Sequence, residues 1–215
     1  MIITYHGGEF FKVQFGEAIV AFNPISKESK LKSTRFGANI ALVSLNHPDM
    51  NGVDQLSFGD REPILISGPG EYEVRDIFIK GWRSSSGYGG EKKINTVFGV
   101  TMEGMSLCFL GALESEKSLP MEMLQAREED IDILFVPIGG DGVLNPADAY
   151  KLAVKLEPKI VIPMHYNLTA DSDKNALKTF FKEAGEESAS AVDKLTIKKK
   201  DLEGKEADLV VISAT

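Results

Sequence analysis

The chain has 215 residues, of which 43% are hydrophobic and 26% charged, with 24 basic and 32 acidic side chains and a formal net charge of −8. These values fit one globular domain over residues 1–215, exclude a disordered or collagen-like chain and disfavour a nucleic-acid partner. Cys108 is the only cysteine, so an intrachain disulfide is excluded. Without a basic leader or an apolar run of about 18 residues, the sequence predicts a cytoplasmic protein with no membrane span.

Short apolar or alternating runs predict β-strands through the first half of the chain. Gly16-Glu17 and residues 102–105 separate neighbouring runs, as hairpin turns would. The segment Gly81–Gly90 is rich in glycine and serine, and we interpret it as a loop, either an exposed tip or a lid over a site. The expected strands are Met1–Tyr5, Glu9–Phe15, Ala18–Phe22, Asn39–Leu45, Ile64–Ser67, Ile77–Lys80, Thr96–Thr101 and Ser106–Leu110.

Helices alternate with strands in the second half. Asn145 and Pro146 are typical of an N-cap and a first helical position, and Pro158 would end that helix. This alternation predicts two sheets packed face to face with helices outside them. The other expected helices are Pro120–Glu129 and Asp173–Ala184, and the other expected strands are Ile131–Pro137, Lys159–Met164, Lys194–Lys199 and Asp208–Ser213.

The three histidines of the chain, His6, His47 and His165, each stand just beyond one of the predicted strands. If those strands run side by side in one direction, the imidazoles meet at one sheet edge, where loops often carry chemistry. His47 shares its loop with Asp49, and together they offer the nitrogen and oxygen donors that a metal ion needs. Each histidine could equally be an ordinary polar loop residue.

Six short segments occur in an order typical of one family. Ser44–Gly52 resembles a His-x-His-x-Asp-His loop, and the others, in chain order, are Ile2–Gly8, Phe22–Pro24, Gly68–Val74, Leu110–Ala112 and Ile162–Tyr166. Together they resemble the metallo-β-lactamase superfamily, nearest its L-ascorbate-6-phosphate lactonase-like hydrolases. This resemblance covers about residues 1–170. It implies an α/β fold, a four-layer αββα sandwich, in which two metal ions about 3.5–4 Å apart activate a water.

The resemblance also indicates which metal ligands this sequence keeps. His47, Asp49 and His165 fall on ligand positions and can donate. Leucine and alanine have no lone pair for a metal, and a methionine thioether suits Cu(I) better than zinc or manganese. We therefore expect no competent dinuclear centre. The positions that depart from the family pattern are Gly8, Asn23, Leu45, Met50 and Ala112.

Two functional hypotheses stay open. In the first, the chain is a non-catalytic scaffold or binding protein whose former metal pocket is filled by apolar side chains, with an unidentified small molecule or protein as partner. In the second, His47, Asp49 and His165 hold one divalent ion, zinc or manganese, for phosphoester or lactone hydrolysis, with Asp49 as the candidate catalytic residue. His6 and Glu71 are weaker candidates for a fourth donor. The expected cofactor is accordingly none or a single metal ion.

Overall fold

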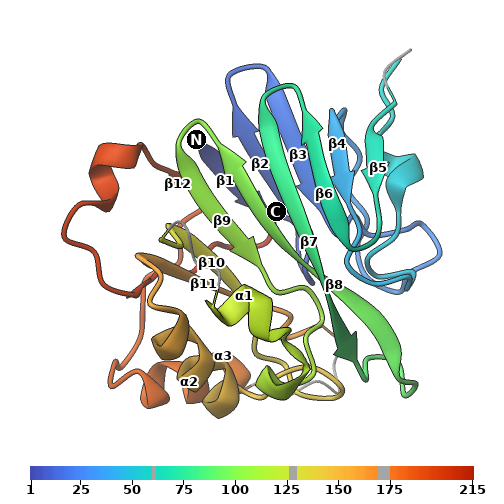
Figure 1. Cartoon of the computed structure of the whole chain (residues 1–215). Coiled ribbons are helices and arrows are strands. Elements are labelled where there is room, and N and C mark those ends of the chain that lie inside the picture. The colour runs from blue at the N-terminus through green and yellow to red at the C-terminus, as the bar shows by residue number, and fades with distance from the viewer. Residues whose placement is uncertain (60–61, 126–129, 169–174) are drawn as a thin grey trace.

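Two β-sheets form the framework in the computed structural model, which describes residues 1–59, 62–125, 130–168 and 175–215 (Figure 1). The first sheet has six strands in the order β12-β1-β2-β3-β4-β5. β1, β2 and β3 pair antiparallel, and β4 and β5 then continue parallel to β3. Its strands are β1 (Ile2–Tyr5), β2 (Phe11–Phe15), β3 (Ala18–Phe22), β4 (Ile40–Leu42), β5 (Ile64–Ile66) and β12 (Leu195–Thr196).

The second sheet has seven strands in the order β13-β11-β10-β9-β8-β7-β6. β6 to β9 form an antiparallel meander, and β10, β11 and β13 extend it parallel to β9. The parallel strands β10 and β11 are buried along their whole length, as their continuous apolar sequences require. The strands are β6 (Gly70–Val74), β7 (Ile77–Ser86), β8 (Lys93–Met102), β9 (Met105–Phe109), β10 (Ile133–Pro137), β11 (Ile160–Met164) and β13 (Asp208–Leu209).

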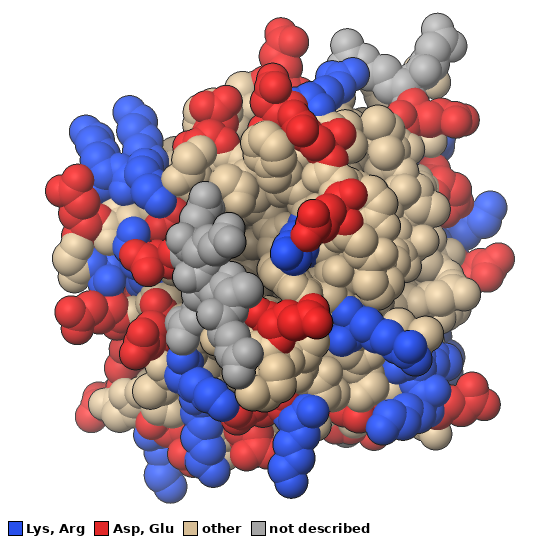
Figure 2. Space-filling view, in the orientation of Figure 1, with Lys and Arg blue, Asp and Glu red and all other residues tan. Residues whose placement is uncertain are grey.

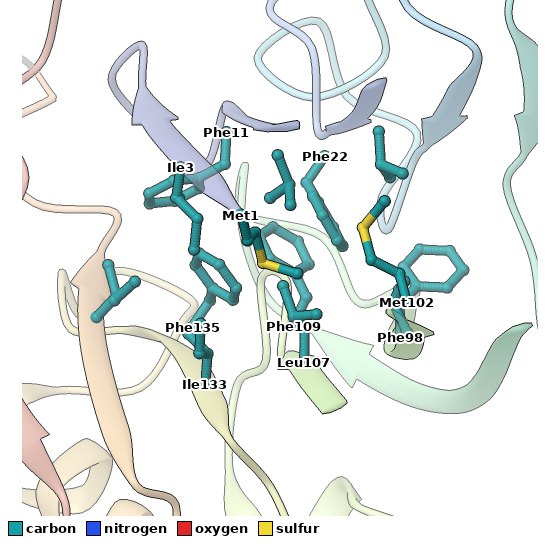
Figure 3. Close-up of a cluster of buried hydrophobic side chains, with 14 of the residues drawn as sticks. Met1, Ile3, Phe11, Phe22, Phe98, Met102, Leu107, Phe109, Ile133 and Phe135 are labelled. Carbon is teal, nitrogen blue, oxygen red and sulfur yellow. The ribbon is translucent and has the colours of Figure 1, made fainter. Parts of the chain in front are cut away.

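One apolar layer fills the space between the sheets (Figure 3). Phe11 of β2 packs edge-on against Phe135 of β10, with ring centroids 4.8 Å apart. Phe22 of β3 lies 4.8 Å from Phe109 of β9. All four rings are 0% exposed, and burying each one is worth about 1.5–3 kcal/mol. These contacts lock the sheets face to face and so fix the loops at their edges.

The outer layers of the sandwich differ from each other. Helices α2 and α3 pack their apolar faces against the seven-stranded sheet. Side chains from the segment 24–39 and a 3-10 helix cover the outer face of the six-stranded sheet instead. The two-sheet α/β sandwich is therefore confirmed, but the described α-helices lie on one side of it (Figure 1). The helices are α1 (Met121–Gln125), α2 (Pro146–Leu156) and α3 (Ala176–Glu183), with 3-10 helices η1 (Val53–Leu56), η2 (Glu116–Ser118) and η3 (Lys199–Leu202).

Capping at α2 confirms the boundaries predicted for this helix. The Asn145 side chain accepts a hydrogen bond from the Asp148 amide at 3.0 Å, and Pro146 is the first helical residue. At the other end Glu157 adopts a left-handed conformation with φ of 47°, directly before Pro158. Asparagine supplies an acceptor to an otherwise unpaired helical amide, which explains why this boundary is readable in the sequence.

The prediction of a loop over Gly81–Gly90 is wrong for its first part. β7 continues to Ser86, which pairs with Lys93 of β8, and Ser86 is 0% exposed. Pairing with a long apolar neighbour overrides the turn-like composition of serine and glycine. The turn between β7 and β8 is confined to residues 87–92.

Other boundaries also differ from the prediction. The last two strands are short, Leu195–Thr196 and Asp208–Leu209, because each pairs with one neighbour at a sheet edge. Parts of two predicted helices, residues 126–129 and 173–174, lie outside the described residues.

None of the helices in the described ranges has the length and apolar character that crossing a bilayer requires. On the face shown in Figure 2, acidic and basic side chains are intermixed around a largely uncharged centre.

Asp132 is a buried acidic residue that connects the seven-stranded sheet to neighbouring segments. Its carboxylate is 0% exposed and accepts from Lys159 at 3.0 Å, from Lys199 at 2.5 Å and from the Ser106 amide at 2.9 Å. Burial alone would raise the pKa of Asp132, but the hydrogen bonds from Lys199, Ser106 and Lys159 outweigh burial and lower it. Lys199 belongs to η3, so this contact ties the C-terminal segment to the sheet.

We predict that Asp132→Asn lowers the free energy of unfolding by about 2 kcal/mol, because two ammonium groups lose their buried acceptor. A depressed folded-state pKa stabilises the fold above the ordinary carboxyl pKa, and that gain is lost as the pH falls through the folded value. The difference between the two proteins should therefore be constant near neutral pH and shrink as the pH falls below about 4. Urea unfolding across this range measures it, and the exposed Asp130→Asn is the matched control. A difference that grows on acidification would contradict the assignment.

Candidate functional site

Two of the three histidines meet at one edge of the sandwich. His47 follows β4 of the six-stranded sheet, and His165 follows β11 of the seven-stranded sheet. Between them lies Tyr88, whose ring centroid is 4.9 Å from that of His47 and 4.6 Å from that of His165, edge-on in both cases. The expectation that strand ends bring histidines together thus holds for this pair.

Asp49 completes this group from the His47 loop. The Tyr88 hydroxyl donates to Asp49 Oδ2 at 2.6 Å, and the Ser29 hydroxyl donates to Oδ1. The Asp49 amide donates to His47 Nδ1 at 3.2 Å, which curls the loop so that both side chains face the same way. The phenol of Tyr88 therefore occupies the space among the three candidate metal ligands His47, Asp49 and His165.

Apolar side chains also pack against Tyr88, which is partly exposed. They form a small cluster in which every core member is at most 6% exposed. Leu45, Met50 and Ala112 stand at the positions where the family resemblance places metal ligands, and here they pack against one another. This lining offers a cation dispersion contacts but no lone pairs, apart from the soft sulfur of a thioether. The cluster comprises Leu45, Met50, Ala112 and Val143, with Tyr88 packed against them.

His165 contacts a buried carboxylate that the sequence motifs do not indicate. Glu9 Oε1 lies 2.6 Å from His165 Nδ1, and the two side chains are 0% and 3% exposed. The second Glu9 oxygen accepts from the Asn23 amide at 2.6 Å, and this amide also donates to the Ser44 hydroxyl at 2.8 Å. Asn23 thus serves the fold as a donor to a carboxylate, a role that an ionised aspartate could not fill.

The turn that carries Tyr88 is fastened to its neighbours. The Gly87 amide donates to the Gly142 carbonyl at 2.9 Å, and a Cβ on Gly142 would lie only 2.4 Å from the Gly87 backbone. Ser85 donates to Glu114 at 2.5 Å, and Lys92 pairs with the same carboxylate at 3.4 Å. The glycine-rich segment 139–142 before α2 thus packs against the turn that carries Tyr88. This contact helps to hold Tyr88 in the site.

The two weaker metal candidates lie elsewhere. His6 packs between the rings of Phe10 and Phe36, at 5.0 and 5.4 Å, and its Nδ1 is 2.9 Å from the Thr215 hydroxyl. Burial, with Lys12 and Lys32 nearby, lowers the pKa of His6 to about 4, so its ring is neutral at physiological pH. Glu71 is an exposed residue of β6, paired with Lys80 at 2.8 Å. The structure brings neither of them into the group around Tyr88.

Electrostatics at the site favour neutral rings. Burial lowers the pKa of His47, and Lys93 and His165 add to this effect while Asp49 opposes it. Burial and the hydrogen bond to Asp49 raise the pKa of Tyr88 far above that of a free phenol. Tyr88 is therefore a protonated donor to Asp49 at neutral pH, and His47 is an uncharged imidazole that accepts at Nδ1.

These residues do not fit a dinuclear metal centre. A catalytic zinc site usually has three protein ligands and an open position. In the described ranges, no three His, Cys, Asp or Glu side chains stand close enough together to hold one ion. The phenol among His47, Asp49 and His165 separates the donors that remain. No catalytic step through a metal follows from this arrangement.

Two mixed sheets with helices on the outside, and a site at the edge where strands of both sheets end, define an α/β sandwich of the metallo-β-lactamase type. The chain belongs to the metallo-β-lactamase superfamily, since the profile of the beta-lactamase superfamily domain matches residues 2–165. This confirms the resemblance that the sequence motifs indicated.

Its relatives carry names that refer to metal-dependent hydrolysis. A UPF0173 metal-dependent hydrolase of Lysinibacillus sphaericus is 28% identical, with 78% of this chain and 86% of the relative covered. A crystal structure from Thermotoga maritima, named as a Zn-dependent hydrolase of the same superfamily, superimposes with a TM-score of 0.76 at 26% identity, covering 98% of this chain and 97% of the other. A metal-dependent hydrolase of Parabacteroides distasonis shares the fold at 17% identity, with a TM-score of 0.64 and coverage of 98% and 91%.

We predict that Glu9→Ala lowers the free energy of unfolding by about 3 kcal/mol, because it leaves His165 Nδ1 and the Asn23 amide buried without their acceptor. Denaturant unfolding followed by circular dichroism measures the loss. Glu17→Ala, at the exposed turn between β2 and β3, is the matched control and should change stability by less than about 0.5 kcal/mol. Equal effects of the two substitutions would show that the Glu9 contacts carry no special weight.

Proposed function

We propose that this chain is a non-catalytic member of the metallo-β-lactamase superfamily that has lost its dinuclear centre and acts by binding. One observation carries the proposal: the Tyr88 side chain fills the space among His47, Asp49 and His165, with its hydroxyl 2.6 Å from Asp49 Oδ2. A water activated by two metal ions would need that same space. Its binding partner would be a small molecule or another protein.

The packing around Tyr88 supports this proposal energetically. Replacing charged or ligating groups by well-packed apolar ones is often neutral or stabilising. Ala112, at 0% exposure, and Leu45, at 1%, are buried too tightly for an ion and its water to lie beside them. A bridging carboxylate at position 112 would reduce the repulsion between two dications, and a methyl group cannot. The same substitutions that remove ligands thus build a dry cluster.

One observation favours a second candidate, a hydrolase with a single metal ion. A carboxylate behind a histidine, as Glu9 stands behind His165 at 2.6 Å, is the usual arrangement around metal-ligating imidazoles, because it fixes the tautomer. His47, Asp49 and His165 would hold the ion, and its chemistry would be to polarise a phosphoryl or carbonyl oxygen. This function requires Tyr88 to leave its present position. The names of the relatives agree with it.

Metal analysis separates the two candidates. For the binding protein we predict no tightly bound ion after reconstitution with Zn²⁺ or Mn²⁺, and the same melting temperature with and without chelator, because no ion stabilises the folded state. Elemental analysis and calorimetry measure these quantities. A single tightly bound ion that His165→Ala removes, with a lower melting temperature in chelator, would instead establish the mononuclear hydrolase. Two ions in the unaltered chain would refute the loss of the centre.

Restoring the donors tests the cause of the loss. We predict that Leu45→His, Met50→His and Ala112→Asp, combined with Tyr88→Ala to clear the pocket, raise zinc binding to two ions per chain. The three ligand substitutions without Tyr88→Ala should bind less, because the phenol still separates the donors. Zinc stoichiometry measured after dialysis, on variants with native circular dichroism, gives the answer. If all variants bind like the original chain, the missing donors are not what limits metal binding.

A further inference from the structure

A cavity lies next to the site and is lined in part by the turn between β1 and β2. It is a cavity of about 490 Å³, in the size range of small-molecule pockets. The turn after β1, the segment after β11, helix α3 and the last residues of the chain enclose it. None of the residues around Tyr88 lines it, so its use is independent of what happens at the filled metal pocket. Its apolar walls include Ile25, Leu31, Leu168, Leu177, Val211 and Ile212.

Three of the polar side chains that line this cavity can each donate a hydrogen bond to a ligand, and His6, Ser213 and Thr215 line it as well. Lys32, Tyr166 and Asn167 all line it, and none of these side chains has a hydrogen-bond or ion-pair partner among the described residues. No Asp or Glu side chain is among the described residues that line the cavity, although the chain as a whole carries an excess of eight acidic charges.

An ammonium, a phenol and an amide that have no hydrogen-bond or ion-pair partner among the described residues, beside an apolar wall, together favour one class of ligand. A carboxylate accepts several hydrogen bonds and pairs with an ammonium. An apolar body gains from burial against leucine, isoleucine and valine side chains. A cationic ligand would find no counter-charge on a described side chain here, and a purely apolar one would make no use of the three donors.

We propose that this cavity binds a small carboxylic acid with an apolar body, its carboxylate at Lys32, Tyr166 and Asn167 and its body against the apolar wall. The cavity adjoins the filled metal pocket through the chain itself, because Tyr166 directly follows His165, whose amide donates to the Gly8 carbonyl at 2.8 Å. Such a ligand would give the proposed binding function its site and its chemical class. Its binding does not depend on the loss of metal chemistry.

Calorimetric titration of the full chain with 3-phenylpropanoate and with octanoate tests the proposal, and 3-phenylpropanamide serves as the neutral isostere. We expect saturable binding of one carboxylate per chain and binding of the amide at least fivefold weaker. Lys32→Gln should weaken carboxylate binding about fivefold, the effect of one partly exposed ion pair. Lys30→Gln, an exposed neighbour outside the cavity, is the matched control and should change nothing.

Filling the cavity gives the second arm of the test. Leu177→Trp on α3 and Ala191→Trp on the C-terminal segment each place an indole against the cavity, and at least one of them should abolish carboxylate binding while the melting transition stays cooperative. The proposal is overturned if neither carboxylate binds saturably, if the amide binds as tightly, if Lys30→Gln matches Lys32→Gln, or if both filled variants bind undiminished. Metal content does not enter these outcomes, so they are separate from the test of the metal pocket.

Discussion

A buried carboxylate joins the two sheets where the site lies, and the arrangement of the site depends on it. Glu9 comes from the turn after a strand of one sheet, and His165 ends a strand of the other, yet their side chains meet at 2.6 Å with almost no exposure. A charge in such surroundings is tolerated only when its acceptor capacity is used. His165 and Asn23 are therefore held in place, and the His47 loop follows, since the Ser44 amide donates to Asn23 at 2.8 Å.

This framework has the form of a metal site, but its contents are different. The carboxylate of Glu9 contacts the His165 imidazole, as carboxylates do behind metal-ligating histidines, and the loop that carries His47 and Asp49 is present too. What fills the centre is a phenol packed on aliphatic side chains. A fold does not fix a function, and here apolar side chains pack where the family resemblance places metal ligands. The binding proposed for the neighbouring cavity would need no metal.

Much of the fold was predictable because apolar periodicity reports burial directly. The strands around Phe11 and Phe135, and the Asn145 cap of α2, follow from local sequence. Tyr88 was not selected, because a lone tyrosine among glycines looks like a loop tip, and only the β7–β8 pairing and the contact of Gly142 carry it into the site. Glu9 was missed for a similar reason, since its partners lie far away in the sequence. When a site is built from contacts between distant segments, no single segment carries a strong sequence signal for it.

The segment after β3, which covers the six-stranded sheet, is joined to the loop after β4, and this limits how either can move. A Cβ at Gly52 would lie 2.3 Å from the Ser26 amide nitrogen, and that amide donates to the Pro48 carbonyl at 2.8 Å. The Ser29 hydroxyl also donates a hydrogen bond to Asp49. The segment after β3 and the loop after β4 are therefore joined by more than one contact. Neither is free to move by itself, so the two stretches are expected to open together, as a single cooperative unit.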